Sequence, residues 1–218
     1  MTLSEEDYIK AIYHLGKGEG NPISTNAIAE QMNTKPSSVT DMIKKLSDKN
    51  LVHYKKYKGV QLTESGILTA LSIVRKHRLW EVFLVDKLDF AWDEVHDVAE
   101  QLEHIKSEQL IDKLDAYLGS PKVDPHGDPI PSKEGKFTKS VKKLVSELPV
   151  GTSGICVGVK DSSVAFLKFL DKNKIALGDD FMLIDREEFD GSVQLKTKDE
   201  ILRISHQIAS NLYLEVSE

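Results

Sequence analysis

The sequence has one cysteine and lacks any long apolar segment. Cys156 has no second cysteine with which to form an intrachain disulfide, which fits a reducing cytoplasm. No window of 18 apolar residues occurs, so a membrane-spanning helix is excluded. The first seven residues are acidic, unlike the basic and then apolar start of a secretory signal peptide. We therefore expect a cytoplasmic protein without a membrane partner.

The remaining composition is that of an ordinary globular protein. With 218 residues, 40% hydrophobic and 29% charged, the chain is long enough for two or three small domains with cores. The pattern predicts a mostly α-helical protein with a small β domain. We expect a winged helix-turn-helix over residues 1–62, a helical domain over 63–142 with a proline-rich loop at 119–136, and a small β-barrel over 147–218.

The first part has the order helix, helix, helix, hairpin. Ser4 and Asp7 predict the start of the first helix as a capping box, and Ser24 with Thr25 predicts the start of the second. Pro36 falls in the first turn of a third helix that runs to about residue 48. Residues 51–54 and 60–62 flank a lysine-rich turn and predict a two-stranded wing.

Further along, the chain changes from helical to strand periodicity. Helices are predicted from about 63 to 88, 93 to 105 and 107 to 118. The following segment, 119–136, holds four of the seven prolines, which predicts either a linker or a loop held by another part of the chain. Short strands are predicted at 154–159, 181–184, 192–195 and 201–204.

A basic segment points to DNA. Between residues 35 and 58 there are seven lysines and two aspartates, a local charge of +5 in a chain of net charge −6. The third helix would begin with short side chains and no arginine, so we expect DNA shape and thymine methyl groups to supply much of the specificity. The alternative is a lysine-rich solvated face of an unrelated helical domain. The residues expected at DNA are Thr25, Lys35, Pro36, Ser37, Ser38, Thr40, Lys44, Lys45, Lys55, Lys56 and Lys58.

The helical region carries a cluster of possible metal ligands. Four of them fall within an arc of about 100° on the helix predicted over 93–105, and two more are spaced i, i+4 on the preceding helix. Imidazole and carboxylate together suit a divalent transition metal. The alternative is a charged, solvated helix face. The six residues are His96, Glu100, Glu103 and His104, and His77 and Glu81.

Several motifs together resemble one known family. They lie at residues 7–9, 36–40, 62–66, 75–81, 95–104 and 125–131, and they resemble the metal-dependent repressors of the diphtheria toxin repressor and manganese transport regulator type (DtxR/MntR). The resemblance extends over the whole chain. It implies that residues 63–142 form a helical metal-binding and dimerisation domain and that residues 147–218 form an SH3-like β-barrel, similar to the FeoA-type domain of longer members. It implies a homodimer that binds double-stranded operator DNA when loaded with metal, represses metal-uptake or homeostasis genes, and is not an enzyme.

The resemblance also implies two metal sites. The first would use Asp7, Glu100, Glu103 and His104, with His77 close by. The second would draw on His77, Glu81 and His96, with Asp124, His126 and Asp161 added from the loop and the C-terminal domain. Ser162 is the alternative to Asp161, and the division of His77 and His96 between the sites is open. The chain departs from the manganese regulators at Lys10, where they carry a second carboxylate, and this argues against a tight two-metal cluster.

The implied effector is Mn(II), with Fe(II) as the alternative. Asp7 and Glu100 stand where the iron-sensing branch carries a thioether and a thiol, and hard carboxylates favour manganese. Without metal, repulsion among Asp7, Glu100 and Glu103 would leave the first helix loosely placed. Two other classes are less well supported. A di-iron helical oxidase needs Glu-x-x-His motifs that the sequence lacks, and a winged-helix regulator of a small organic ligand leaves the histidine and glutamate stripe without a role.

Overall fold

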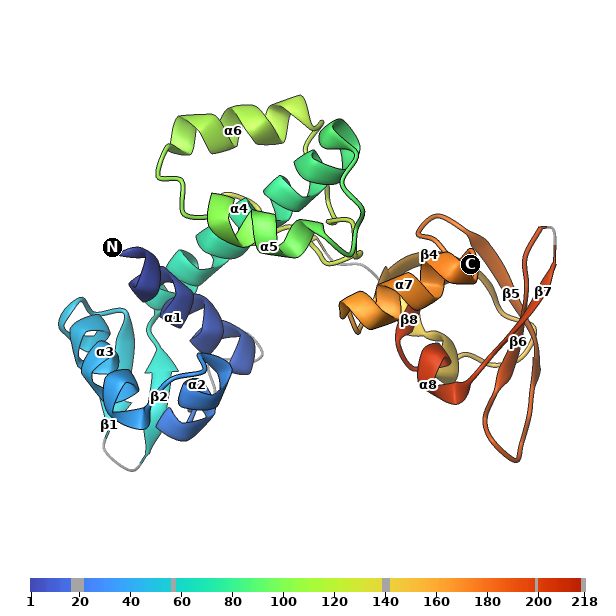
Figure 1. Ribbon diagram of the computed structural model, residues 1–218, viewed down its shortest axis with the longest axis horizontal. Coiled ribbons are helices and arrows are strands. Elements are labelled where there is room, and N and C mark those ends of the chain that lie inside the picture. The colour runs from blue at the N-terminus through green and yellow to red at the C-terminus, as the bar shows by residue number, and fades with distance from the viewer. Residues whose placement is uncertain (17–21, 56–57, 139–141, 199, 217–218) are drawn as a thin grey trace. The chain divides into compact units, whose positions relative to one another are not determined.

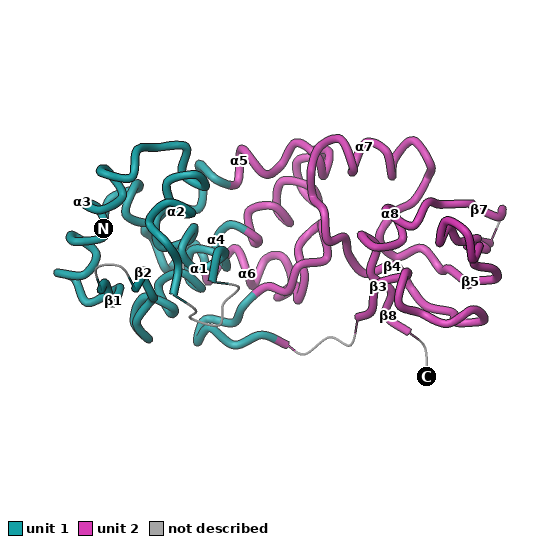
Figure 2. Tube along the Cα trace, turned by 90° about the horizontal axis from the view of Figure 1, so that it is seen from below, with its two compact units in different colours: residues 1–77, 100–111, 131–137 teal, residues 78–99, 112–130, 138–218 magenta. Residues whose placement is uncertain are grey.

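The computed structural model describes residues 1–16, 22–55, 58–138, 142–198 and 200–216, which form two compact units (Figures 1 and 2). Unit 1 contains residues 1–77, 100–111 and 131–137, and unit 2 contains 78–99, 112–130 and 138–218. Helices α4 (Glu64–Leu88) and α5 (Val95–Leu102) each contribute to both units. Within the described residues, no helix combines the length and apolarity needed to cross a bilayer.

Unit 1 has the element order expected of a winged helix-turn-helix. It contains α1 (Leu3–Leu15), α2 (Thr25–Gln31), α3 (Pro36–Asp48) and an antiparallel hairpin of β1 (Val52–Lys55) and β2 (Gly59–Leu62). Pro36 is the first residue of α3, where its missing N–H is not needed. The parts of the predicted break and wing turn at 17–21 and 56–57, including Lys56, lie outside the described residues. The core of the unit includes Ile9, Ile12, Ile28, Val39, Ile43, Leu46 and Val60.

The start of α1 differs from the prediction. Thr2, not Ser4, is the N-cap residue, and its hydroxyl accepts a hydrogen bond from the N–H of Glu5 at 3.3 Å. Glu5 in turn accepts the N–H of Thr2 at 2.9 Å, which completes a capping box two residues earlier than expected. Because Glu5 takes the capping role, Asp7 lies inside the helix and its carboxylate is not used as a cap.

The predicted helix at 93–105 is shorter than expected. Helix α5 ends at Leu102, so Glu103 and His104 lie in the turn that follows, and the prediction that four ligands share one helical stripe is wrong. The helical period does not apply to residues in this turn, so it does not predict where these two side chains point. The next helix, α6 (Glu108–Tyr117), matches its predicted range closely.

Unit 2 contains a six-stranded antiparallel sheet in the order β3-β8-β4-β5-β6-β7. Strands β4 (Ser153–Val159), β5 (Asp180–Arg186), β6 (Val193–Lys196) and β7 (Ile201–Ile204) match the four predicted strands. The prediction missed β3 (Lys142–Leu144), the short helix η1 (Val145–Glu147), α7 (Val164–Lys172), α8 (His206–Ala209) and β8 (Leu212–Val216). The core of the β domain includes Val145, Leu167, Leu170, Leu183, Leu195, Ala209, Leu212 and Leu214, so α7 and α8 pack in the same core as the sheet.

The proline-rich loop in unit 2 is held by the β domain. The N–H of Val159 in β4 donates to the carbonyl of His126 at 2.9 Å, and the Lys142 ammonium donates to the carbonyl of Gly127 at 2.8 Å. Gly127 has a φ of +81°, and a Cβ there would lie 1.9 Å from the carbonyl oxygen of Val157, so only glycine fits. Of the two predicted alternatives, the structure shows a loop held by another part of the chain.

Candidate metal centres

In unit 1, His104 lies between two carboxylates of α1. Its Nδ1 is 2.7 Å from Glu6 Oε2, and its Nε2 is 3.0 Å from Asp7 Oδ1. A neutral imidazole has one N–H and one lone pair, so it can donate to only one of these carboxylates. If Nδ1–H donates to Glu6, the Nε2 lone pair and the Asp7 oxygen face each other, an arrangement that fits a cation. Glu6 then orients the ring from its other side.

Glu103 completes this group. Its side chain is fully buried, and donor atoms of Asp7, Glu103 and His104 all lie within 4.8 Å of one another. The Nδ1 of His77 is 2.7 Å from Glu103 Oε2. We call the residues Asp7, Glu103 and His104 the α1 centre. They supply two carboxylates and an imidazole, a donor set that suits a divalent metal ion.

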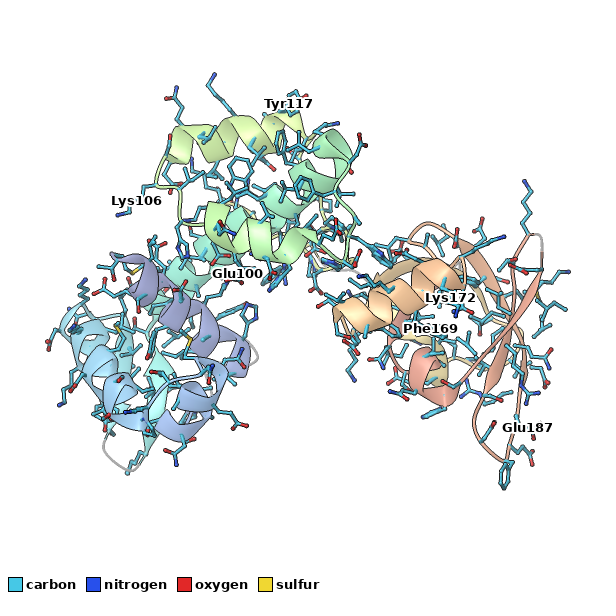
Figure 3. All side chains as sticks on the ribbon, in the orientation of Figure 1. Glu100, Lys106, Tyr117, Phe169, Lys172 and Glu187 are labelled. Carbon is cyan, nitrogen blue, oxygen red and sulfur yellow. The ribbon has the colours of Figure 1, made fainter. Side chains whose placement is uncertain are left out.

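Glu100 also lies beside the α1 centre, but it is paired with a lysine. The Lys10 ammonium is 2.5 Å from Glu100 Oε1, and it is 2.7 and 2.8 Å from the two oxygens of Glu103. Figure 3 labels Glu100 on α5. The expectation that Glu100 and Glu103 repel each other without compensation is therefore wrong, because Lys10 neutralises part of their charge.

Burial and neighbouring charges perturb the acids of the α1 centre. Burial raises the pKa of Asp7, and the nearby Glu103 carboxylate raises it further, against the lowering effect of His104. Burial also opposes ionisation of Glu103, but the hydrogen bond from His77 and the charge of Lys10 outweigh it and lower the Glu103 pKa. Glu103 is thus held in the ionised form that a metal ligand requires.

A second group lies in unit 2. Glu81 of α4 and the loop residues Asp124 and His126 are all buried, and their donor atoms lie within 4.8 Å of one another. The Nδ1 of His126 is 3.8 Å from Glu81 Oε1, while its Nε2 lies 2.8 Å from the carbonyl oxygen of Trp92. Because a carbonyl only accepts, Nε2 carries the proton in the neutral ring and Nδ1 faces Glu81 with its lone pair. We call Glu81, Asp124 and His126 the loop centre.

Asp124 is fixed by the loop and by a cation. Its Oδ1 accepts the N–H groups of His126 at 2.8 Å and of Asp128 at 2.9 Å, and its Oδ2 is 3.3 Å from Arg78 Nε. Burial, followed by the charges of Glu81 and Asp128, raises the Asp124 pKa to about 7. Burial disfavours the charged form of His126, but the Glu81 carboxylate 3.8 Å away, the charge of Asp124 and the Trp92 carbonyl outweigh it and raise the His126 pKa to about 9. At neutral pH the His126 imidazole is therefore favoured in its protonated, positively charged form.

Two predicted ligands of the second site, His96 and Asp161, are not among the three residues of the loop centre. The Nδ1 of His96 lies 3.6 Å from Glu81 Oε1, with 62% of its side chain exposed, so it is at the margin of the loop centre. Asp161 is exposed, and its Oδ1 accepts the N–H of Ser163 at 2.9 Å. Among the described residues, Asp161 is not one of the grouped donors. His77, whose assignment was open, contacts Glu103 in the α1 centre.

Most of the residues expected at DNA are exposed on unit 1. Thr25 begins α2 and is half-buried. Thr40 is also half-buried, and its hydroxyl donates to the carbonyl of Pro36 at 3.0 Å. Lys44 lies 3.4 Å from Asp41, so part of its charge is compensated within α3. The exposed members of the set are Lys35, Pro36, Ser37, Ser38, Lys44, Lys45, Lys55 and Lys58.

Sequence reasoning missed three residues that support the two centres. Glu6 orients His104, Trp92 orients His126 through its carbonyl, and Arg78 balances the charge of Asp124. A signal existed for Glu6, because it immediately precedes Asp7 in the acidic first turns of α1. The other two act through a backbone oxygen and through a contact 46 positions away in the chain, for which the sequence gives no pattern.

Comparison with known proteins gives three family matches along the chain. Residues 1–60 match the N-terminal DNA binding domain of iron dependent repressors, residues 63–132 match their metal binding and dimerisation domain, and residues 143–216 match the FeoA domain. The predicted fold class, a winged helix-turn-helix, a helical dimerisation region and a small β domain, is therefore confirmed.

Individual relatives agree with these matches. The HTH-type transcriptional regulator MntR of Oceanobacillus iheyensis is 37% identical over 146 residues, 67% of this chain and 91% of that protein. The iron-dependent repressor IdeR of Mycobacterium tuberculosis is 33% identical over 126 residues, 58% of this chain and 54% of that protein, so the match spans about half of its length. A solved manganese-dependent transcriptional repressor in complex with manganese is 32% identical, with a TM-score of 0.82 over 98% of this chain and all of that one.

These relatives are DNA-binding regulators, which confirms the prediction that the chain belongs to a class of regulators and not of enzymes. The family models together cover all three parts of the chain, and the MntR relative is matched over nine-tenths of its length. By these matches, the chain belongs to the family of iron-dependent repressors, the DtxR/MntR-type regulators that its motifs resemble.

Proposed function

We propose that this protein is a metal-dependent transcriptional repressor that binds double-stranded operator DNA as a homodimer when loaded with Mn(II). Its targets would be metal-uptake or homeostasis genes, and its place the cytoplasm. The observation that carries the proposal is that the α1 centre and the exposed residues expected at DNA belong to the same compact unit. The metal would act as the effector of DNA binding.

Manganese is the proposed effector because of the donor set. The α1 centre offers carboxylate oxygens and imidazole nitrogen, and none of the donor groups found within the described residues contains a sulfur atom. Hard oxygen ligands suit Mn(II). Two similar solved structures, one named a manganese-dependent transcriptional repressor and one named the manganese regulator SloR, support this assignment. Fe(II) is the second candidate, because it accepts the same donors and because the relative IdeR is named as iron-dependent.

The mechanism rests on the position of α1. Asp7 on this helix and Glu103 and His104 beyond α5 converge, so the residues themselves bring the first helix to the end of α5. A bound divalent ion would supply the positive charge that holds these donors together. Glu6 fixes the orientation of His104, and His77 keeps Glu103 in place.

The same helix is tied to the proposed recognition helix. Lys49, the C-cap residue of α3, donates to both oxygens of Glu5 at 2.7 and 2.8 Å. Glu5, Glu6 and Asp7 are consecutive, so one turn of α1 contacts both α3 and the ligand His104. We propose that fixing α1 at the metal fixes α3 for DNA binding.

DNA contacts are assigned by analogy with the helix-turn-helix mode. The start of α3, Pro36 to Ser38, would meet base edges, and the wing lysines would hold phosphates. Thr40 contributes its methyl group, because its hydroxyl proton is given to the backbone. The full proposed set is Thr25, Lys35, Pro36, Ser37, Ser38, Thr40, Lys44, Lys45, Lys55, Lys56 and Lys58.

We also propose the loop centre as a second metal site, with His96 at its margin and Asp161 as a ligand only after rearrangement. Glu100 would join the α1 centre only if it leaves Lys10. The proposed domain boundaries are 1–62, 63–142 and 147–218, and the ranges of the three family matches, 1–60, 63–132 and 143–216, support them.

The function is tested by titrating Mn(II), anaerobic Fe(II), Co(II) and Zn(II) into metal-free protein, with fluorescence anisotropy of promoter DNA as the readout. A steep rise in affinity with Mn(II) and a small rise with Fe(II) would support the manganese assignment, and equal responses would extend it to iron. If no metal changes DNA binding, the proposed function is wrong. Asp7→Asn should lose the response, and Glu108→Gln, on an exposed carboxylate of α6 outside the proposed DNA-contact set, is the control.

A further inference from the structure

Unit 2 contains a cavity of about 590 Å³ that is open to solvent and shares Asp124 with the loop centre. Its walls come from the second half of α4, the proline-rich loop, Trp92, and α7 with the turn that follows it. On α4, Val82, Val85 and Asp86 are spaced i, i+3 and i+4, so they share one face of the helix. The volume is within the range of about 300–1,000 Å³ that is typical of sites for small molecules.

The walls of this cavity are mainly apolar. The loop supplies Pro121, Val123 and Pro125, and the turn after α7 supplies Ala176 and Leu177. Val123 is 42% exposed and Ala176 is also exposed, so part of the apolar lining is in contact with water. A ligand with an apolar body would remove this surface from water, which favours its binding.

The charged groups of the lining are all acidic. They are Asp86, Asp124 and Asp171, and the described residues that line the cavity include no lysine, arginine or histidine. The charge of Asp124 is compensated by Arg78. Within the described part of the chain, the Asp86 carboxylate has no hydrogen-bond or ion-pair partner, and Asp171 uses only its Oδ2, which accepts the indole N–H of Trp92 at 3.1 Å. Two carboxylates therefore remain for a cationic group of a ligand.

Trp92 and Asp171 are the best-ordered part of the lining. Their hydrogen bond holds the indole and the carboxylate side by side, and Trp92 also stacks on His126 with the ring centroids 6.3 Å apart. A carboxylate next to an indole ring suits an ammonium group, through an ion pair and a cation–π contact. An anionic ligand would meet the same carboxylates without a counter-charge and would be repelled.

We propose that this cavity binds a small organic cation with an apolar body, of the arylalkylamine class. The ammonium group would lie at Asp171 and Trp92, with Asp86 as the second carboxylate, and the apolar body would lie against the valines and prolines of the walls. Because Asp124 also belongs to the loop centre, the ligand would contact a residue of the proposed second metal site. The inference does not depend on the metal response of DNA binding.

The test compares two probes that differ in the sign of their charge. 2-Phenylethylamine and 3-phenylpropionate have the same phenyl ring and two-carbon chain, and they end in an ammonium and a carboxylate group. Saturation-transfer nuclear magnetic resonance on the metal-free full chain gives the affinity of each. The amine should bind and the carboxylate should bind more weakly. No binding of the amine, or equal affinities for the two probes, would overturn the proposal.

Charge variants locate the ammonium group. Asp86→Asn and Asp171→Asn should each weaken the amine by up to about fivefold, as expected for exposed ion pairs. Asparagine at position 171 keeps an oxygen that accepts the indole N–H. The double variant should bind the two probes equally, and a preference for the amine that survives in it would contradict the assignment. Glu94→Gln, on an exposed carboxylate of unit 2 outside the lining, is the control.

A second measurement locates the apolar body. Ala176→Phe places a ring in the cavity from an exposed position and should weaken the amine, whereas Ala165→Phe, at an exposed position of α7 outside the lining, should not. The sequence has two tryptophans, so in Trp80→Phe only Trp92 remains, and its emission should change when the amine binds. Unweakened binding in Ala176→Phe, or Trp92 emission that does not respond to the bound amine, would show that the amine binds elsewhere.

Discussion

Replacing Glu103 by glutamine should separate metal sensing from folding. The side chain is fully buried and contacts both Lys10 and His77, so the amide keeps the volume but removes the charge at the middle of the α1 centre. Removing one partner of a buried ion pair costs about 3–5 kcal/mol. Because Lys10 retains Glu100, we expect the lower end, about 3 kcal/mol of unfolding free energy. For a chain of this length, that corresponds to a fall in melting temperature of roughly 6–12 °C.

The effect on metal binding should be larger than the effect on folding. Loss of an outer partner of a ligand costs 10–100-fold in metal affinity, so loss of a ligand carboxylate should cost more than about 100-fold. Calorimetry on metal-free Glu103→Gln gives the stability change, and anisotropy with operator DNA gives the response to Mn(II). Glu108→Gln, on the exposed start of α6, is the control. Metal-stimulated DNA binding equal to that of the unmodified protein would refute the assignment of Glu103 as a ligand.

Three further predictions concern DNA contact, pH and coupling. Lys45→Ala should weaken binding to all DNA sequences and lower the slope of log K against log salt by about 1, and an unchanged slope would exclude a phosphate contact. Between pH 7 and 9, the metal affinity of the loop centre should rise about tenfold per pH unit, because His126, with a pKa of about 9, must lose its proton before it can bind the ion. Below pH 7 the affinity should depend more steeply on pH, because Asp124, with a pKa of about 7, must then lose a proton as well. Calorimetry in an Asp7→Asn background measures this, and a flat profile contradicts it. Lys49→Met should leave Mn(II) affinity unchanged and reduce the metal-stimulated gain in DNA affinity up to about fivefold, because the Lys49 side chain is half exposed and such pairs contribute about 0.2–1 kcal/mol.

Local chemistry made the DNA-binding part the most predictable. Proline at the start of α3 and the lysine-rich turn of the wing are signals carried by neighbouring residues, and the structure has both elements within one or two residues of the expected bounds. The start of α1 was misplaced because Ser4 and Thr2 are both good N-cap residues, and only the reciprocal bond from Glu5 decides between them.

The candidate site was only partly predictable. Spacing and family resemblance predicted the types and positions of the ligands. They did not predict that α5 ends at Leu102, which places Glu103 and His104 outside the helix. The pairing of Lys10 with Glu100 and Glu103 joins residues 90 and more positions apart, and no local pattern encodes it. The same holds for the β domain, where α7 was missed because the strands around it dominated the pattern.

The position of β8 in the sheet affects how the β domain is made. It is the last strand along the chain, but it pairs with β3 on one side and β4 on the other. Between the end of β4 and the start of β8 lie 52 residues, which a ribosome adds in roughly 3–10 s. During that interval the edges of β3 and β4 are without their partner strand and are open to pairing with other chains. Nascent chains that stop before Leu212 should therefore aggregate, and complete folding of this domain must follow the synthesis of its final strand.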